Sequence, residues 1–358
     1  MRRPLQVVAL ALLPLVPVSL VAQTAQTAQD LRLVRFVEYI EALRRQAGIP
    51  GLAAAIVGTR DIQWEAAFGR QDVDRAIATR TDTPFPLNGL TQILTTALVL
   101  RCVEEGRLSL DTPTAAAPAL TPRQILTHSS GPSGAAAFAY DPSRFAALGP
   151  EVEACTGRSF RVSMIELLER LAMFDSAPGS DIVQLTPGDP DAAGGDDVPD
   201  AADLDRYQRV LGRLATSYSV DRRGRPRARE SEPVPLTPAD GLISTVLDYA
   251  HFDLALKQGL LLLPGTVTDS WIAPVGADDK RLPHGFGWFV QIYRGETIVW
   301  QFGLSENASS SLVVMVPSRG LTLVLLANSS GLARGFALEE GDLTVSPFGR
   351  LFLEIFVR

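Results

Sequence analysis

Four short apolar runs near the carboxyl end of the chain decide the fold: Phe286–Tyr293 (FGWFVQIY), Thr297–Phe302 (TIVWQF), Ser310–Val316 (SSLVVMV) and Leu321–Ala327 (LTLVLLA). Turn residues separate them, with Arg294-Gly295 after the first run and Pro317-Ser318-Arg319-Gly320 before the last. Runs of β-branched and aromatic residues that alternate with such turns predict consecutive strands.

Two further strands are expected near the start of the chain, at Leu52–Val57 and Ile62–Phe68, joined by a turn at Thr59-Arg60-Asp61. Apolar residues at helical spacing predict a helix over 30–46, and a closing helix is expected over 347–357. Helical patterns dominate between the two groups of strands. The sequence therefore predicts an α+β fold, with one antiparallel sheet built from both termini and a helical subdomain inserted into it.

We expect a single domain over residues 30–358. Its sheet part would comprise about 30–75 and 280–358, and its helical part about 76–279. Aspartates alternate with Pro, Gly and Ala over about 175–205, which predicts an acidic flexible insertion. Calcium binding by this insertion is the alternative, but the spacing of an EF-hand is missing.

The first residues predict export. Arg2 and Arg3 precede an apolar run from Leu5 to Ala22 that Pro14 and Pro17 interrupt, a pattern typical of a signal peptide over residues 1–22. An uncleaved amino-terminal anchor is the alternative. The mature protein is then expected in a periplasm or outside the cell, with no membrane span after cleavage.

Charge, cysteine and lysine content bear on the partners and the chemistry of the protein. The chain carries 33 basic and 40 acidic residues, a balance that argues against a nucleic-acid partner. Its two cysteines, Cys102 and Cys155, fall on expected apolar helix faces, which favours two buried free thiols and leaves a disulfide open. Only two lysines occur, Lys257 and Lys280, and neither follows a serine by three residues.

Several segments occur in an order typical of one family: 48–53 (GIPGLA), 104–111 (EEGRLSLD), 125–131 (ILTHSSG), 240–245 (DGLIST), 285–288 (GFGW) and 325–329 (LLANS). Together they resemble the serine beta-lactamase-related family, which includes class C beta-lactamases, DD-peptidases and related esterases. The resemblance covers nearly the whole mature chain. It implies a beta-lactamase/transpeptidase-like fold.

The family's first motif, Ser-x-x-Lys, places a nucleophile and its base one helical turn apart. The resemblance sets Gly89 in the nucleophile position and Gln92 in the base position. Glycine has no atom to attack with, and a neutral amide is no general base. We expect Asn88 to cap a helix with a buried stripe at Leu90, Ile93, Leu94, Ala97 and Leu98. Thr91 is a poor substitute nucleophile because no lysine would activate it.

The other two motifs are also altered. The Tyr-x-Asn motif corresponds to Tyr140-Asp141-Pro142, in which Pro142 replaces the asparagine and offers no side-chain hydrogen bond. The Lys-Thr-Gly or His-x-Gly motif corresponds to Gln301-Phe302-Gly303, in which Gln301 replaces the cation or imidazole. Gly303, the glycine that lets a ligand approach the strand, is retained.

These changes imply a catalytically inactive relative that binds a cell-envelope ligand, such as a peptidoglycan fragment or another small carbonyl or carboxylate compound. Backbone N–H groups of Gly89 and Leu304 would still form the family's oxyanion hole. One alternative is an active esterase, amidase or beta-lactamase with an unrecognised nucleophile. Another is a structural partner in an envelope complex, whose cleft would be filled by its own side chains.

No cofactor and no metal are expected. The three histidines, His128, His251 and His284, do not have the spacing of metal ligands, and no cysteine joins them. His128 lies in the Thr-His-Ser-Ser-Gly segment, where we expect a buried hydrogen-bonding residue of a turn.

Overall fold

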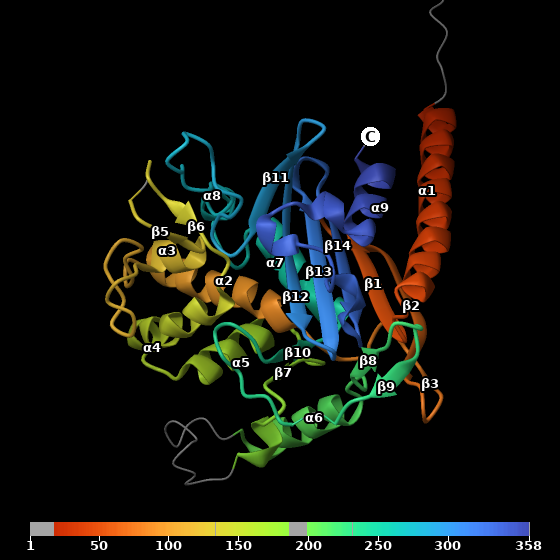
Figure 1. Cartoon of the computed structure of the whole chain (residues 1–358), viewed down its shortest axis with the longest axis horizontal. Coiled ribbons are helices and arrows are strands. Elements are labelled where there is room, and N and C mark those ends of the chain that lie inside the picture. Colours follow the sequence, from red (N-terminus) through yellow and green to blue (C-terminus); the bar gives the residue numbers. More distant parts are fainter. Residues whose placement is uncertain (1–17, 133, 186–198, 231, 358) are drawn as a thin grey trace, which may run out of the picture.

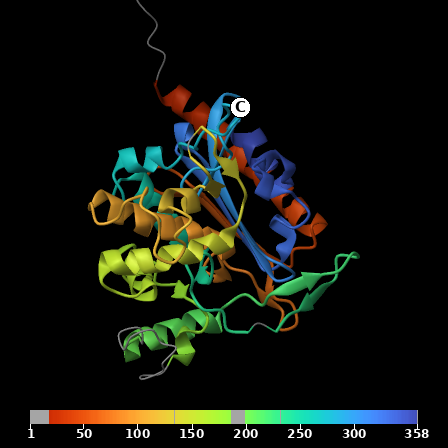
Figure 2. The ribbon, with the colours of Figure 1, turned by 60° about the vertical axis from the view of Figure 1, so that its left-hand side comes forward.

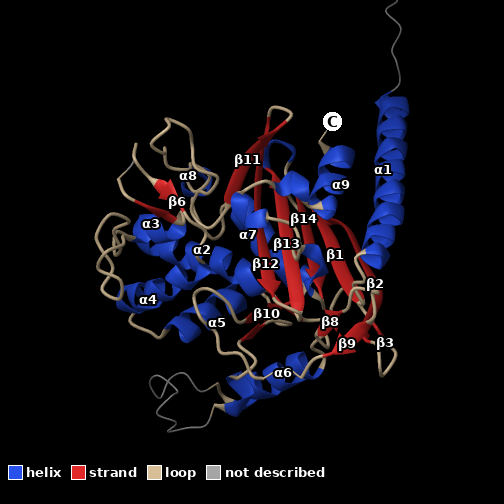
Figure 3. Ribbon diagram, in the orientation of Figure 1, coloured by secondary structure: helices blue, strands red, loops and turns tan. Residues whose placement is uncertain are grey.

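The computed structural model describes residues 18–132, 134–185, 199–230 and 232–357 (Figure 1). Its centre is a seven-stranded antiparallel sheet with the order β11-β12-β13-β14-β1-β2-β3. Helices lie on both sides of this sheet (Figure 3). Strands from the two ends of the chain meet where β14 pairs with β1, as predicted.

The strands of the sheet lie close to the positions expected from the sequence. They are β1 (Gly51–Val57), β2 (Ile62–Asp72), β3 (Ile77–Ala78), β11 (Phe289–Tyr293), β12 (Glu296–Ser305), β13 (Ser309–Val316) and β14 (Leu321–Ala327). The amino-terminal hairpin and the four late strands are thus confirmed. β11 begins at Phe289 rather than Phe286, because Gly287 takes a left-handed φ of 75° that interrupts an extended chain.

The helices follow the same pattern. They are α1 (Val18–Gln46), α2 (Thr91–Glu104), α3 (Pro122–Leu126), α4 (Gly149–Thr156), α5 (Phe160–Arg170), α6 (Ala201–Gly212), α7 (Val246–Lys257), α8 (Pro264–Asp269) and α9 (Pro347–Phe356). The helices predicted over 30–46 and 347–357 are confirmed as α1 and α9, and α1 extends further toward the amino terminus than expected. Two short 3₁₀ helices matter for the site, η1 (Asn88–Leu90) and η2 (Pro142–Leu148).

One three-stranded and two two-stranded sheets lie outside the main sheet among the described residues. They are β4 (Phe85–Pro86), β10 (Leu242–Ser244) and β7 (Ala177–Pro178) in one group, β5 (Ser129–Ser130) with β6 (Ala137–Phe138), and β8 (Tyr218–Val220) with β9 (Pro226–Ala228). The β8–β9 hairpin extends from the body of the molecule in Figure 2.

The sheet is buried on both faces. Along β1, Leu52, Ala54 and Ile56 pack in one cluster with Phe36 of α1 and Phe352 of α9. The alternate residues Ala53, Ala55 and Val57 pack in a second cluster with side chains of α2, α5 and α7. Side chains on a strand point to alternate faces, so this strand contributes to both layers of the core. The two layers of helices are seen on opposite sides of the sheet in Figure 2.

Cys102 of α2 and Cys155 of α4 form a disulfide, with their Cα atoms 6.1 Å apart. The prediction of two free thiols is therefore wrong, and the alternative, a disulfide, is correct. Each cysteine does lie on a buried helix face, as expected. The packing of α2 against α4, which brings these faces together, is a tertiary contact that neither helix encodes alone.

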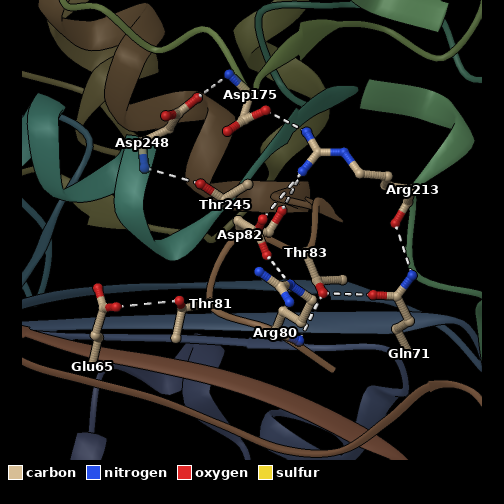
Figure 4. A network of polar contacts seen from close by, with 10 residues as sticks. All are labelled: Glu65, Gln71, Arg80, Thr81, Asp82, Thr83, Asp175, Arg213, Thr245 and Asp248. Carbon is tan, nitrogen blue, oxygen red and sulfur yellow. Dashed lines mark hydrogen bonds and ion pairs between the residues drawn. The ribbon is translucent and has the colours of Figure 1, made fainter. Parts of the chain in front are cut away.

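A polar network connects the helical part to the sheet part (Figure 4). The guanidinium of Arg213 pairs with the carboxylates of Asp82 and Asp175, and its backbone carbonyl accepts a hydrogen bond from Gln71 Nε2 of β2 at 3.3 Å. The backbone N–H of Asp175 donates to Asp248 Oδ2 of α7 at 2.8 Å. Burial raises the pKa of Asp248 to about 6.

Two predictions fall on parts of the chain that the structure does not describe. The expected signal peptide, residues 1–22, lies mainly in 1–17, and the expected acidic insertion at 175–205 contains 186–198. Among the described residues, no helix combines the length and apolar character needed to cross a membrane.

Candidate functional site

Gly89, in the predicted nucleophile position, lies on η1 directly before α2. A Cβ atom added to Gly89 would stand 2.6 Å from the carbonyl oxygen of Phe302 and 3.4 Å from Cα of Gly303, both on β12. The backbone of β12 therefore occupies the space that a serine side chain would need. The assignment of Gly89 to the nucleophile position stays a prediction from the family resemblance.

Gly303 of β12 lies equally close to the backbone that leads into η1. A Cβ atom on Gly303 would stand 2.5 Å from the carbonyl oxygen of Leu87 and 2.4 Å from Ser311 Oγ. That hydroxyl donates to the same Leu87 carbonyl at 2.7 Å. Gly303 was predicted to let a ligand approach the strand, but here it admits the protein's own backbone.

The start of α2 differs from the prediction. Asn88 does not cap the helix: the residue at the cap position is Leu90, which makes no side-chain cap hydrogen bond. Asn88 instead takes a left-handed φ of 49°, and its Nδ2 donates to Ser309 Oγ at 3.1 Å. The helix is also buried on all sides from Thr91 to Leu100, rather than along one stripe.

Gln92, in the predicted base position, is fully buried. The backbone N–H of Asp141 donates to His128 Nδ1 at 3.1 Å, so Nδ1 is an acceptor and the proton of the neutral ring lies on Nε2. That Nε2–H donates to Gln92 Oε1 at 3.2 Å. Gln92 Nε2 has no hydrogen-bond partner among the described residues, and it lies 3.5 Å from the position that a Cβ of Gly89 would take.

His128 is the buried turn residue that the sequence predicted. It takes a left-handed φ of 47° and has no exposed surface. Burial lowers the pKa of His128 to about 3, so the ring is neutral at physiological pH. Because Nδ1 accepts one hydrogen bond and Nε2 donates another, no lone pair of the ring remains for a general base.

Gln301, in the position predicted for the cation or imidazole of the third motif, bonds to backbone groups of β12 and of the preceding turn. Its Oε1 accepts from the backbone N–H of Phe302 at 2.9 Å, and its Nε2 donates to the carbonyl of Gly287 at 3.3 Å. The same Nε2 lies 3.5 Å from Nε2 of His284, whose Nδ1 donates to the carbonyl of Gly285 at 2.7 Å. Burial lowers the pKa of His284 well below its usual value, so this ring is neutral too.

Aromatic rings fill the space beside these residues. The Tyr140 ring lies 4.5 Å from that of His128 and 5.5 Å from that of Phe302, centroid to centroid. His284 lies 4.7 Å from His128 and 4.6 Å from Phe289. Burial raises the pKa of the Tyr140 phenol well above its usual range, which leaves it a neutral hydroxyl.

Two predicted site positions lie at the margin of this cluster. Pro142 begins η2, after the cap residue Asp141. Leu304 lies on β12 opposite Ser310 of β13. Because N–H groups alternate in direction along a strand, the Leu304 amide points to the same open edge of β12 as the Phe302 carbonyl.

The sequence did not identify His284 as part of the site. From the sequence, His284 is noted only as a histidine without metal-ligand spacing, although the adjacent 285–288 segment (GFGW) is among the family-like segments. The structure brings His284 together with Gln92, His128, Tyr140 and Gln301. All five side chains are uncharged, and the described residues contain no group of three His, Cys, Asp or Glu able to hold a metal.

The antiparallel sheet, the helices on both its faces and the position of η1 against β12 define the beta-lactamase/transpeptidase-like fold. The chain belongs to the beta-lactamase family, whose model, described as Beta-lactamase, matches residues 36–342. The family resemblance and the fold class expected from the sequence are both confirmed. No curated protein matched the chain.

Solved structures share the fold at low sequence identity. An octameric penicillin-binding protein homologue from Pyrococcus abyssi is 18% identical with a TM-score of 0.66, covering 90% of this chain and 77% of that one. D-amino acid amidase from Ochrobactrum anthropi SV3 is 15% identical with a TM-score of 0.65, covering 90% and 99%. A penicillin-binding protein from Bacillus halodurans is 19% identical with a TM-score of 0.63, covering 81% and 94%.

Proposed function

We propose that this chain is a non-catalytic member of the beta-lactamase family that acts by binding. The observation that carries the proposal is the contact at Gly89, where the carbonyl of Phe302 lies 2.6 Å from the position of the missing Cβ. A serine at this position would lack space as well as a base, since the neutral amide of Gln92 stands one helical turn away.

The alternative of an active hydrolase needs another nucleophile beside a free base. The nearby hydroxyls are poorly suited to this role. Thr91 Oγ1 is buried and accepts from the backbone N–H of Leu242 at 3.4 Å, and Ser311 Oγ donates to Leu87. Both imidazoles have their nitrogens engaged, which further favours the non-catalytic proposal.

For the ligand, we propose a cell-envelope compound that carries a carbonyl or carboxylate, such as a peptidoglycan fragment. The strand amide of Leu304 would donate to it together with that of Gly89. We propose a periplasmic or secreted location, and the Cys102–Cys155 disulfide supports it, because structural disulfides are typical of oxidising compartments.

One observation favours a second candidate, a structural partner in an envelope complex. Tyr140 packs against both His128 and Phe302, so the protein's own side chains fill the space beside the predicted site residues. A ligand would have to displace Tyr140, whereas a partner protein that docks on the outer surface would not.

The proposals are tested with the purified mature protein. Benzylpenicillin and a fluorophosphonate are incubated with it, and the intact mass is measured. We expect no covalent adduct, and a stoichiometric adduct at any residue would refute the non-catalytic proposal. Titration calorimetry with muropeptides then separates the two binding roles, because saturable heat supports the ligand, while its absence at millimolar concentration leaves the structural partner.

A further inference from the structure

The β8–β9 hairpin, which projects from the body of the molecule (Figure 2), is rich in arginine. Within its eight residues 222–229 the chain carries five arginines: Arg222, Arg223, Arg225, Arg227 and Arg229. Every residue from 222 to 230 is exposed. The hairpin contains none of the candidate site residues, so its arginines need a separate explanation.

The base of the hairpin is fixed to the body. Tyr218 of β8 is buried, and its hydroxyl accepts a hydrogen bond from the backbone N–H of Val73 at 2.8 Å. The backbone N–H of Tyr218 donates to the carbonyl of Asn328 at 2.8 Å. Val220 lies against the turn after α1, since a Cβ atom on Gly48 would stand 2.8 Å from Val220 Cγ1. These contacts hold the hairpin in one orientation relative to the sheet.

The tip of the hairpin is also ordered by its own contacts. Asp221 Oδ1 accepts from the backbone N–H groups of Arg223 and Arg225 at 2.8 and 3.0 Å. Its other oxygen, Oδ2, lies 2.8 Å from Arg225 Nε, so the charge of Arg225 is balanced within the turn. Gly224 takes a left-handed φ of 74°, which glycine adopts without strain. The turn therefore presents its remaining side chains from a preorganised backbone.

The other four arginines face away from the body. Tyr218 pairs with Ala228, and Ser219 pairs with Arg227. Because side chains alternate along a strand, Arg227 and Arg229 lie on the face opposite the buried Tyr218. Among the described residues, Arg225 is the one arginine of this hairpin with an ion-pair partner. The guanidinium groups of the other four are exposed and not balanced by a carboxylate: Arg222, Arg223, Arg227 and Arg229.

The charge of the hairpin contrasts with that of the whole chain. From Asp221 to Glu230, five arginines stand against two carboxylates, which gives a local charge of +3 in a chain of net charge −7. Arginine binds phosphate oxygens in a bidentate manner, so a surface that carries phosphates is the complementary partner. A long flexible polyanion would also meet the acidic remainder of the chain, whereas a flat surface would meet the projecting hairpin first.

We propose that the β8–β9 hairpin docks the protein electrostatically on a membrane surface that carries anionic phospholipids. The four unbalanced arginines would contact the lipid phosphates. Between 222 and 229 the residues other than arginine are glycine, proline and alanine, so the hairpin has no large apolar side chain to insert and would stay at the level of the headgroups. This surface is independent of the proposed function, because it shares no residue with the Gly89 region.

Binding of the purified mature protein to vesicles tests the proposal. The protein is sedimented with vesicles of phosphatidylcholine alone and of phosphatidylcholine mixed with phosphatidylglycerol. We expect binding to the mixed vesicles only. It should be lost when salt is raised from about 0.1 M to about 1 M, because the screening length falls from about 10 Å to about 3 Å.

Two paired variants locate the effect. Arg227→Gln with Arg229→Gln should weaken binding about fivefold for each arginine removed. Arg60→Gln with Arg294→Gln is the matched control, because it removes the same charge from two exposed turns elsewhere and should leave the affinity unchanged. A fourfold variant that also carries Arg222→Gln and Arg223→Gln should bind the mixed vesicles no better than the neutral ones.

Three results would overturn the proposal. The first is no binding of the unaltered protein to the mixed vesicles at low salt. The second is equal affinity of the hairpin pair and the control pair. The third is a salt-sensitive dimer in sedimentation velocity that the fourfold variant lacks, without vesicle binding, because the hairpin would then dock on a second copy of the chain.

Discussion

Replacing Gly89 by alanine measures how closely β12 approaches η1. The added Cβ would stand 2.6 Å from the Phe302 carbonyl oxygen, well inside ordinary van der Waals contact. Relieving such a contact in a packed interior costs about 1–3 kcal/mol. Gly89 does not have a positive φ, so alanine also gains about 0.4–1 kcal/mol by restricting the unfolded chain. We therefore expect a net loss of about 1–2 kcal/mol in the free energy of unfolding.

Urea titration followed by tryptophan fluorescence gives this free energy from the midpoint, provided that the slope is unchanged. Gly212→Ala at the end of α6 is the matched control, since a Cβ there meets nothing within 4 Å. It should stabilise the protein by about 0.5–1 kcal/mol. If Gly89→Ala stabilised the protein as much as Gly212→Ala, the space beside Gly89 would be open and the reasoning would fail.

Three further perturbations have defined outcomes. Burial holds the pKa of Asp248 at about 6 against 3.8 for the unfolded carboxyl, so the free energy of unfolding should fall by roughly 3 kcal/mol as pH rises from about 3 to 7, and Asp248→Asn should flatten that dependence in urea titrations at each pH. Replacing Cys102 and Cys155 by serine opens a bridge across a sequence separation of 53 and should cost about 4 kcal/mol, measured in the same way; a loss below 1 kcal/mol would contradict the disulfide. Lys257→Met leaves the buried Asp253 carboxylate without its partner and should cost about 3–5 kcal/mol, of which the double variant with Asp253→Leu should recover at least half by thermal melting.

Much of the fold could be predicted because the deciding patterns are local. Strand runs, turns and amphipathic helices depend on residues close in sequence, and β1, β2 and the late strands lie near their expected positions. The errors concern distant partners. Asn88 is a favourable cap residue by type, yet its side chain bonds to Ser309, 221 positions away. Cys102 and Cys155 meet only because two helices pack together.

In the candidate site too, the sequence indicates residues but not the contacts between distant elements. The resemblance assigns Gly89, Gln92 and Gln301 to the site, but it gives no information on the distance between η1 and β12, because that distance is set by the packing of two elements more than 200 residues apart in the chain. No family motif includes His284, so the sequence does not predict its place in the candidate site. The structure shows it, because the His284 ring packs between the rings of His128 and Phe289.

The residues at positions 89 and 92 are physically coupled. With glycine at both 89 and 303, β12 lies directly against η1, and the side chain at 92 next to this contact is fully buried. A lysine there would place an ammonium beside the Nε2–H of His128, which is a donor and offers it no acceptor. Burying such an unpaired charge costs several kcal/mol, whereas glutamine presents a neutral oxygen to the same donor. Gln92→Lys alone should therefore destabilise the protein, and a side chain at position 89 would fit only if β12 moved away from η1.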